Sequence, residues 1–229
     1  MMEQRKRKPL VALLHSTRFV VEPVHRVVAS QCPDVEIIHI VDEGILRTLF
    51  RKGEIDGGII DWVGRMAQSA EEAGADLAVL SCSSLSPAVD AVRKRIRIPF
   101  LKIDEPMAEQ AVKTADRIGL VATNLTTPKP STLLIQEVSD RLGKKVTIVP
   151  RVEADAFIKL NRGDIEGHDR AVIDAVKDLL EEVDRVLLAQ ISIARVKEKL
   201  DEETRSRVYS SLDFIGPEID AILERTVST

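Results

Sequence analysis

Cysteine, aromatic residues and long apolar runs are all scarce in this chain of 229 residues. The only two cysteines, Cys32 and Cys82, lie in different settings, so we expect no disulfide framework and a reducing, cytoplasmic location. Aromatic residues make up 3% of the chain, which leaves core packing to Val, Ile, Leu and Ala. The first apolar run, residues 10–14, is interrupted by His15 and Arg18 too early for a membrane span.

Neither a metal-ligand pattern nor a strong charge of one sign is present. The four histidines lack the HxxxH or HExxH spacing of common metal sites, so we expect no metal. The formal net charge is -4 with both signs interspersed, which provides no field for gathering phosphates. We therefore expect a small molecule as the ligand, with neither nucleic acid nor a membrane as a partner.

Apolar segments of strand length alternate with longer amphipathic stretches along the chain. The predicted strands are residues 10–15, 35–41, 77–81, 98–103, 118–122, 146–149 and 186–189. Continuous apolar strands separated by helices indicate parallel sheets covered on both faces. The expected fold class is therefore α/β.

A weak internal repeat, offset by 108 positions, favours two similar lobes. Residues 76–82 and 184–190 each run from an aspartate through an apolar strand to a polar or reactive side chain. The same offset carries His15 onto Thr123. We expect two pseudo-symmetric lobes, each a parallel sheet flanked by helices, with the carboxyl ends of the strands facing a shared cleft. The first lobe would comprise residues 1–103 and 212–229, and the second residues 104–211.

Cys82 is the candidate for the reactive group. It follows a buried strand and precedes Ser83, Ser84 and a helix start, so its sulfur should lie beside free backbone N–H groups that favour the thiolate. The alternative is a buried, inert cysteine, because free cysteine is among the most buried residue types. Cys32 lies in a connection between elements and is interpreted as structural.

Hydroxyl and amide side chains occur at the predicted strand ends. They are Ser83, Ser84, Thr123, Asn124, Thr126 and Thr127. Together with backbone N–H groups they could hold a carboxylate. Each could equally be a helix cap or turn residue, which is the commoner role of these residue types. Only their expected convergence around Cys82 favours binding.

Three stretches, residues 75–84, 98–104 and 118–126, resemble the aspartate/glutamate/hydantoin racemase superfamily. The likeness spans nearly the whole chain. Its most specific parts are the strand that ends in Cys-Ser-Ser at Cys82 and the Gly-x-x-x-Thr-x-x-Thr pattern from Gly119. The resemblance implies two lobes with the active site in the cleft between them, no cofactor, and two cysteines that relay a proton across a carbon next to a carboxylate.

The same resemblance assigns roles to individual residues. Cys82 matches the first family cysteine. Two sets of polar residues match the groups that hold the substrate carboxylate, namely Ser83 and Ser84 in the first lobe and Thr123, Asn124 and Thr126 in the second. Where the family has its second cysteine, this chain has Gln190, which cannot exchange protons at neutral pH.

The leading hypothesis is a cofactor-independent racemase or isomerase of this superfamily, acting on a small carboxylate with Cys82 as proton carrier. Gln190 would orient the substrate or a water, and His15 could do the same or carry a second proton, although packing or capping is its commoner role. One alternative is a one-cysteine decarboxylase, and another is a carboxylate-binding protein without turnover. We also expect a homodimer or higher homo-oligomer.

Overall fold

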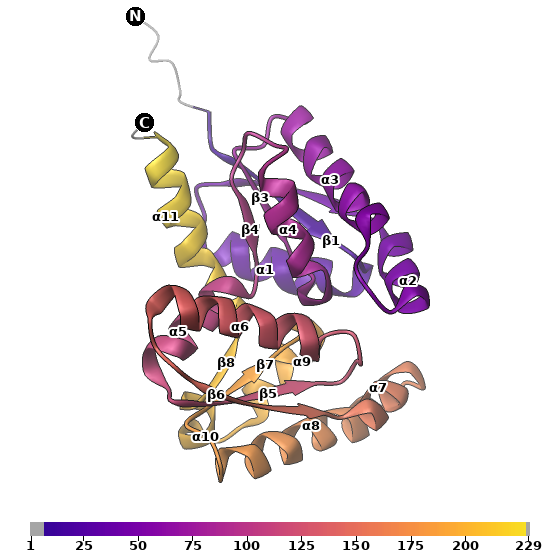
Figure 1. The fold of residues 1–229 in the computed structure, drawn as a ribbon, viewed down its shortest axis with the longest axis vertical. Coiled ribbons are helices and arrows are strands. Elements are labelled where there is room, and N and C mark those ends of the chain that lie inside the picture. Colours follow the sequence, from indigo (N-terminus) through magenta and orange to yellow (C-terminus); the bar gives the residue numbers. More distant parts are fainter. Residues whose placement is uncertain (1–6, 228–229) are drawn as a thin grey trace, which may run out of the picture.

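The structure is a computed structural model that describes residues 7–227. Two four-stranded sheets form the centres of two lobes, and every strand pair in them is parallel (Figure 1). The sheet order is β2-β1-β3-β4 in the first lobe and β6-β5-β7-β8 in the second. The strands are β1 (Leu10–His15), β2 (Glu36–Val41), β3 (Leu77–Leu80), β4 (Phe100–Lys102), β5 (Arg117–Ala122), β6 (Thr147–Val152), β7 (Arg185–Leu188) and β8 (Val208–Ser210).

Helices cover both faces of each sheet. The α-helices are α1 (Val21–Gln31), α2 (Glu43–Lys52), α3 (Gly57–Glu72), α4 (Ser86–Arg93), α5 (Glu105–Thr114), α6 (Pro128–Leu142), α7 (Ala154–Asn161), α8 (Ile165–Leu180), α9 (Ile191–Ala194), α10 (Glu202–Ser206) and α11 (Ile215–Val227). Short 3-10 turns are η1 (Arg18–Val20), η2 (Ser83–Leu85), η3 (Arg195–Lys199) and η4 (Ser211–Asp213). In the first lobe, α2, α3 and α4 pack on one face, and α1 and α11 pack on the other.

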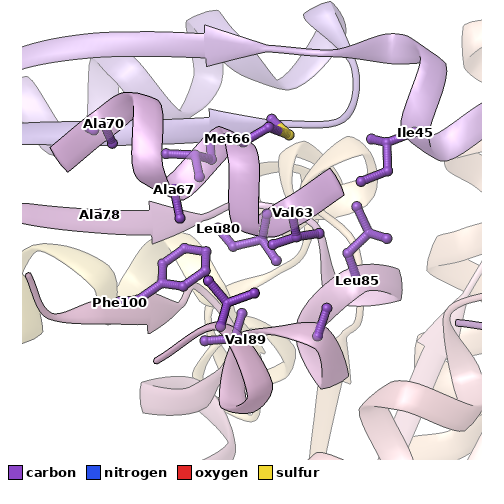
Figure 2. Packing of buried hydrophobic residues seen from close by; sticks show 14 of the residues in the cluster. Ile45, Val63, Met66, Ala67, Ala70, Ala78, Leu80, Leu85, Val89 and Phe100 are labelled. Atoms are coloured by element: carbon purple, nitrogen blue, oxygen red, sulfur yellow. The ribbon is translucent and has the colours of Figure 1, made fainter. Parts of the chain in front are cut away.

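The central strands are buried on both faces, which explains their continuous apolar sequences. In β3, Val79 faces the cluster under α1 and α11, whereas Leu80 faces the cluster under α3 and α4. Figure 2 shows Leu80 packed between Val63 of α3 and Val89 of α4. Because neighbouring residues of a strand point to opposite faces, each apolar residue in these short strands has a core to fill.

Each of the seven predicted strand segments overlaps a strand, although β6 continues to Val152 beyond the predicted end at residue 149, and the sequence analysis missed β8. This strand has only three residues, and Val208 is the one aliphatic residue among them. Polar residues on both sides, in α10 and η4, remove the apolar run that marks the other strands. β8 is defined by its parallel pairing with β7, a tertiary contact that the local sequence does not indicate.

The internal repeat is visible as the same contact at the start of each sheet. Asp76 accepts a hydrogen bond from the backbone N–H of Leu10 at 2.7 Å, and Asp184 accepts one from that of Arg117 at 2.8 Å. Each carboxylate therefore joins the beginning of the third strand of its lobe to the beginning of the first.

The strand registers correct one part of the predicted repeat. Leu14 accepts the N–H of Ser81 as Val121 accepts that of Ala189, so the offset between β1 and β5 is 107 rather than 108. The counterpart of Thr123 is consequently Ser16, not His15.

The chain passes between the lobes twice. It first crosses from β4 into α5, which packs on the second sheet, and it returns from β8 into α11, which packs against the first sheet. Figure 1 shows α11 beside the first lobe, far along the sequence from its neighbours there. The precise lobe boundaries stay a prediction. Within residues 7–227, no helix combines the length and apolar character needed to cross a bilayer.

Candidate active site

Cys82 lies immediately beyond β3, where the chain turns into η2 and α4. Its sulfur accepts backbone N–H groups of Ser84 and Leu85 and is hydrogen bonded to the hydroxyl of Ser16. The predicted helix-start donors are therefore present. Burial outweighs them, however, and raises the pKa of the Cys82 thiol. The expectation of a favoured thiolate is wrong for this structure, and the resting group is a thiol.

Asp104 is a second buried acid beside Cys82, and the sequence analysis gave it no role. Its Oδ1 accepts the hydroxyl of Ser86 at 2.8 Å, and the hydroxyl of Ser83 is also hydrogen bonded to the carboxyl group. Its Oδ2 has no partner within residues 7–227. Burial raises the pKa of Asp104, and its charge would in turn raise the pKa of Cys82. The available signal was its place two residues after the end of β4, in the last position of the stretch 98–104.

Ser84 brings the Cys82 turn into contact with the second lobe. Its hydroxyl is hydrogen bonded to the hydroxyls of Thr126 at 3.0 Å and Thr127 at 3.1 Å. These threonines stand at the start of α6, so η2 of one lobe meets the first helix of the other. Ser84 and Thr126 are therefore brought together as predicted, in a direct contact between the lobes.

Gln190 holds the position in the second lobe that Cys82 holds in the first. Its Oε1 accepts the N–H of Thr123 at 2.6 Å, the hydroxyl of Thr123 at 3.1 Å and the N–H of Asn124 at 3.3 Å. Because Thr123 is the counterpart of Ser16, this contact mirrors the one between Ser16 and Cys82. The Gln190 oxygen therefore accepts the hydrogen bonds that Thr123 and Asn124 of its own lobe donate.

Asn124 makes two further hydrogen bonds within the loop that follows β5. Its Oδ1 accepts both the N–H of Thr126 at 2.8 Å and the hydroxyl of Thr126 at 2.7 Å. The predicted second carboxylate-binding residues are thus assembled, and their donors point to the side-chain oxygens of Gln190 and Asn124. A carboxylate oxygen has the same hydrogen-bonding character as these two acceptors.

The lobes approach one another reciprocally. Turn η2, after β3, contacts α6, and helix α9, after β7, contacts η1. Ile191 of α9 belongs to the apolar cluster that contains Leu13 and Val20 of the first lobe. The end of each third strand is therefore covered by the segment that follows the first strand of the opposite lobe. Whether Cys82 and Gln190 face one another directly stays a prediction.

His15 is fully buried and belongs to a different group of side chains. Its Nδ1 lies 2.7 Å from Oγ of Ser81 and its Nε2 lies 2.9 Å from Nδ1 of His39. Burial, together with His39, lowers the pKa of His15 to about 4. These contacts correspond to the packing role considered for His15, and they bring in His39, which the sequence analysis left without a role.

Cys32 and the hollow beside α11 lie away from the residues around Cys82 and Gln190. Cys32 is buried, its thiol donates to the carbonyl of Gly216 at 3.4 Å, and burial raises its pKa to about 12, which suits a structural cysteine. A hollow of about 620 Å³ lies between residues 93–101 and α11 and contains none of the predicted site residues. Across the described part of the chain, no group of three or more potential ligands could hold a metal ion.

A family comparison agrees with this arrangement. The profile of the Asp/Glu/Hydantoin racemase family matches residues 13–215, which is most of the chain. The chain belongs to this family. The matched region of this racemase-family member contains both strand ends, at Cys82 and at Gln190. No curated protein matches the chain.

Solved structures of racemases share the fold at low sequence identity. A glutamate racemase isoform from Bacillus anthracis is 19% identical with a TM-score of 0.74, covering 96% of this chain and 83% of its own. An aspartate racemase from Picrophilus torridus is 14% identical with a TM-score of 0.69, covering 95% and 94%. An allantoin racemase from Klebsiella pneumoniae is 15% identical with a TM-score of 0.66, covering 94% and 88%. At these identities the likeness concerns the fold.

Proposed function

We propose that this member of the racemase family is a cofactor-independent racemase or isomerase of a small carboxylate, with Cys82 as the proton carrier at the carbon next to that carboxylate. The observation that carries the proposal is the setting of the Cys82 sulfur. It lies at a lobe contact, within hydrogen-bonding reach of the N–H groups of Ser84 and Leu85. Such donors stabilise negative charge as it develops in a transition state.

The carboxylate would bind where side-chain oxygens now occupy the donors of the second lobe. Thr123 and Thr126 each present an N–H and a hydroxyl, and these four donors currently serve Gln190 and Asn124. Ser83 and Ser84 lie on the facing turn. A substrate carboxylate that displaced one of the two amide oxygens would keep every donor satisfied.

A one-cysteine decarboxylase is the second candidate, and the protonation state of the thiol favours it. Because burial raises the pKa of Cys82, the sulfur begins as a proton donor. A carbanion formed by loss of carbon dioxide needs only that one proton. Racemization also needs a group on the opposite face, and Gln190 cannot titrate there.

The deciding experiment is turnover in deuterated water with a panel of D- and L-amino acids, hydantoins and substituted malonates. Racemization or isomerization would replace the hydrogen on the carbon next to the carboxylate by deuterium without loss of carbon. Decarboxylation would release carbon dioxide and place one deuterium on the product. Proton and carbon NMR distinguish these results, and binding without either reaction would indicate a carboxylate-binding protein.

Replacement of the two cysteines separates catalysis from folding. Cys82→Ala should lower turnover by about 10²- to 10⁴-fold, the range of general acid–base contributions. Cys32→Ala, at the buried structural cysteine, should leave turnover unchanged. Full activity of the Cys82 variant would contradict the proposed role of this thiol.

Variants of Gln190 test the absence of a second proton-carrying side chain at this position. Gln190→Ala should mainly weaken substrate binding or orientation, seen as a higher KM. Gln190→Cys should introduce some two-base racemization, because the backbone there matches that at Cys82. Chiral chromatography of the product would measure it.

A further inference from the structure

Three histidines form a continuous hydrogen-bonded row from the surface helix α1 to the end of β3. Nδ1 of His25 lies 3.0 Å from Nε2 of His39, and Nδ1 of His39 lies 2.9 Å from Nε2 of His15. Nδ1 of His15 then lies 2.7 Å from Oγ of Ser81, the residue before Cys82. Neighbouring rings in the row have centroids 5.2 Å and 5.1 Å apart.

The contacts of this row allow all its hydrogen bonds to run in one direction. When the hydroxyl of Ser81 donates to the carbonyl of Leu14, 3.1 Å away, it accepts from Nδ1–H of His15. A neutral His15 then accepts at Nε2 from Nδ1–H of His39, and a neutral His39 accepts from Nδ1–H of His25. In this arrangement all three rings carry the proton on Nδ1, and Nε2 of the half-buried His25 makes no hydrogen bond to the described residues.

The surroundings keep the two inner rings neutral. Burial and the adjacent ring lower the pKa values of both His15 and His39. The carboxylate of Glu22 in α1 raises the pKa of His39 and partly offsets this effect. A row of neutral imidazoles, each with one donor and one acceptor, can pass a proton without holding a stable charge.

The inner end of the row lies on the side of the first sheet on which Ile191 of α9 packs. Neighbouring residues of a strand point to opposite faces, so Ser81 and Cys82 flank the end of β3 on different sides. The face that carries His15 and Ser81 is the one on which Ile191, next to Gln190, packs. The row thus ends on the face of the first sheet that the segment after Gln190 covers.

We propose that His25, His39 and His15 form a proton relay that links solvent to Ser81 and serves the face of the substrate opposite Cys82. Its role in turnover rests on the function proposed above. A water proton would enter at Nε2 of His25, and each ring would pass its Nδ1 proton to Nε2 of the next. His15 would give its Nδ1 proton to Oγ of Ser81, and the Ser81 hydroxyl would turn away from the carbonyl of Leu14 and release its original proton toward the reacting carbon.

Each delivery leaves all three rings in the opposite tautomer, with the proton on Nε2. The relay is then arranged to accept a proton from the carbon through Ser81 and return it to solvent by the reverse steps. No net charge accumulates in either direction, and the number of protons balances over the two events.

Ring-proton exchange in the full chain tests the relay without a substrate. In protein labelled with ¹⁵N-histidine, NMR should show the Nδ1–H tautomer in all three rings and measurable exchange of the His15 proton with water. His25→Gln keeps an N–H donor for His39 but cannot relay a proton. This variant should slow the exchange of the His15 ring proton with water by at least about tenfold, to the rate at which the protein opens locally. Ala29→Gln, at an exposed position of the same helix, should leave it unchanged.

A turnover measurement completes the test. On a substrate from the panel, His25→Gln should lower deuterium incorporation on the face opposite Cys82 by about 10²-fold, while the Cys82 face retains its rate. If no substrate turns over, the proposed function fails and the exchange measurement still decides the relay. Unchanged His15 exchange in His25→Gln, or a different tautomer at His15, would overturn it.

Discussion

At the scale of single residues, the balance of burial and hydrogen bonding determines what Cys82 can do. The N–H groups of Ser84 and Leu85 favour the thiolate, but the enclosed setting and the nearby Asp104 favour the thiol more strongly. Burial raises the pKa values of both Cys82 and Asp104, so each group holds its proton to a higher pH than it would in water. A bound substrate that changes the local charge would shift this balance.

The two thiols should differ in their rate of alkylation. Burial raises the pKa of Cys32 to about 12, and its sulfur is tied to Gly216, whereas Cys82 is partly exposed. Iodoacetamide should therefore label Cys82 faster than Cys32 near neutral pH, but more slowly than a free cysteine peptide, and both rates should rise with pH. Peptide mass spectrometry over time measures this. Faster labelling of Cys32 would contradict the assignment.

His15 should make stability depend on acid pH. Its pKa is about 4 in the folded chain, against an ordinary value of 6.5, so the unfolded chain binds the proton first as the pH falls. The free energy of unfolding should consequently fall between pH 6.5 and 4, by up to about 3 kcal/mol from this group. Urea unfolding of the wild type and of His15→Gln, which lacks the titrating ring, gives the difference. Equal pH slopes for the two would refute it.

The polar residues of the candidate site could be located from the sequence because strand ends can be located from it. Cys82 and Thr123 each come one or two residues after an apolar run, and parallel sheets place such ends on one edge. Contacts between different strands cannot be located from the sequence in this way. The row from His25 to Ser81 joins four elements through sheet register and helix packing, and no local pattern in the sequence contains that information.

At the scale of elements, short apolar strands were predictable and their packing partners were not. The pattern identified β5, for example, but not that Gly119 lies directly beneath α8. A Cβ atom at Gly119 would lie 3.1 Å from Cγ2 of Val183 and 3.2 Å from Cδ1 of Leu179. Glycine there allows the helix to sit close to the strand.

Gly119→Val should therefore separate α8 from β5 and destabilise the chain. Overpacking of this kind costs about 1–3 kcal/mol. Gly57→Val provides the control, because the Cβ position at Gly57 meets no atom within 4 Å. Its effect on the free energy of unfolding should stay within about 0.5 kcal/mol. Similar losses for both variants, measured by urea unfolding, would show that close packing at Gly119 is not the cause.

At the scale of the whole molecule, Lys102 connects the lobes through a buried ammonium group. Its Nζ lies 2.7 Å from Oδ2 of Asp90 in α4 and 3.5 Å from Oε2 of Glu137 in α6, and only 3% of its side chain is exposed. The side chain of Asp90 is 48% exposed and that of Glu137 is 60% exposed. The lysine therefore depends on partners that lie at the surface of two different lobes.

Removal of these partners should be strongly non-additive. Glu137→Ala alone leaves Asp90 in place and should cost less than about 1 kcal/mol. Asp90→Ala with Glu137→Ala leaves a buried unpaired ammonium and should cost about 3–5 kcal/mol. Urea unfolding of the four-member cycle measures the coupling. A double variant whose loss equals the sum of two small single losses would contradict this account.

The two passages of the chain between the lobes constrain how the molecule can open. One passage joins β4 to α5 and the other joins β8 to α11, so the lobes are held at two places rather than one. Two attachments define a hinge axis, and they leave bending about it as the soft motion while resisting twist and sliding. Entry of a substrate would thus open the contact between Ser84 and Thr127 along a fixed arc and return it to the same register at each closure.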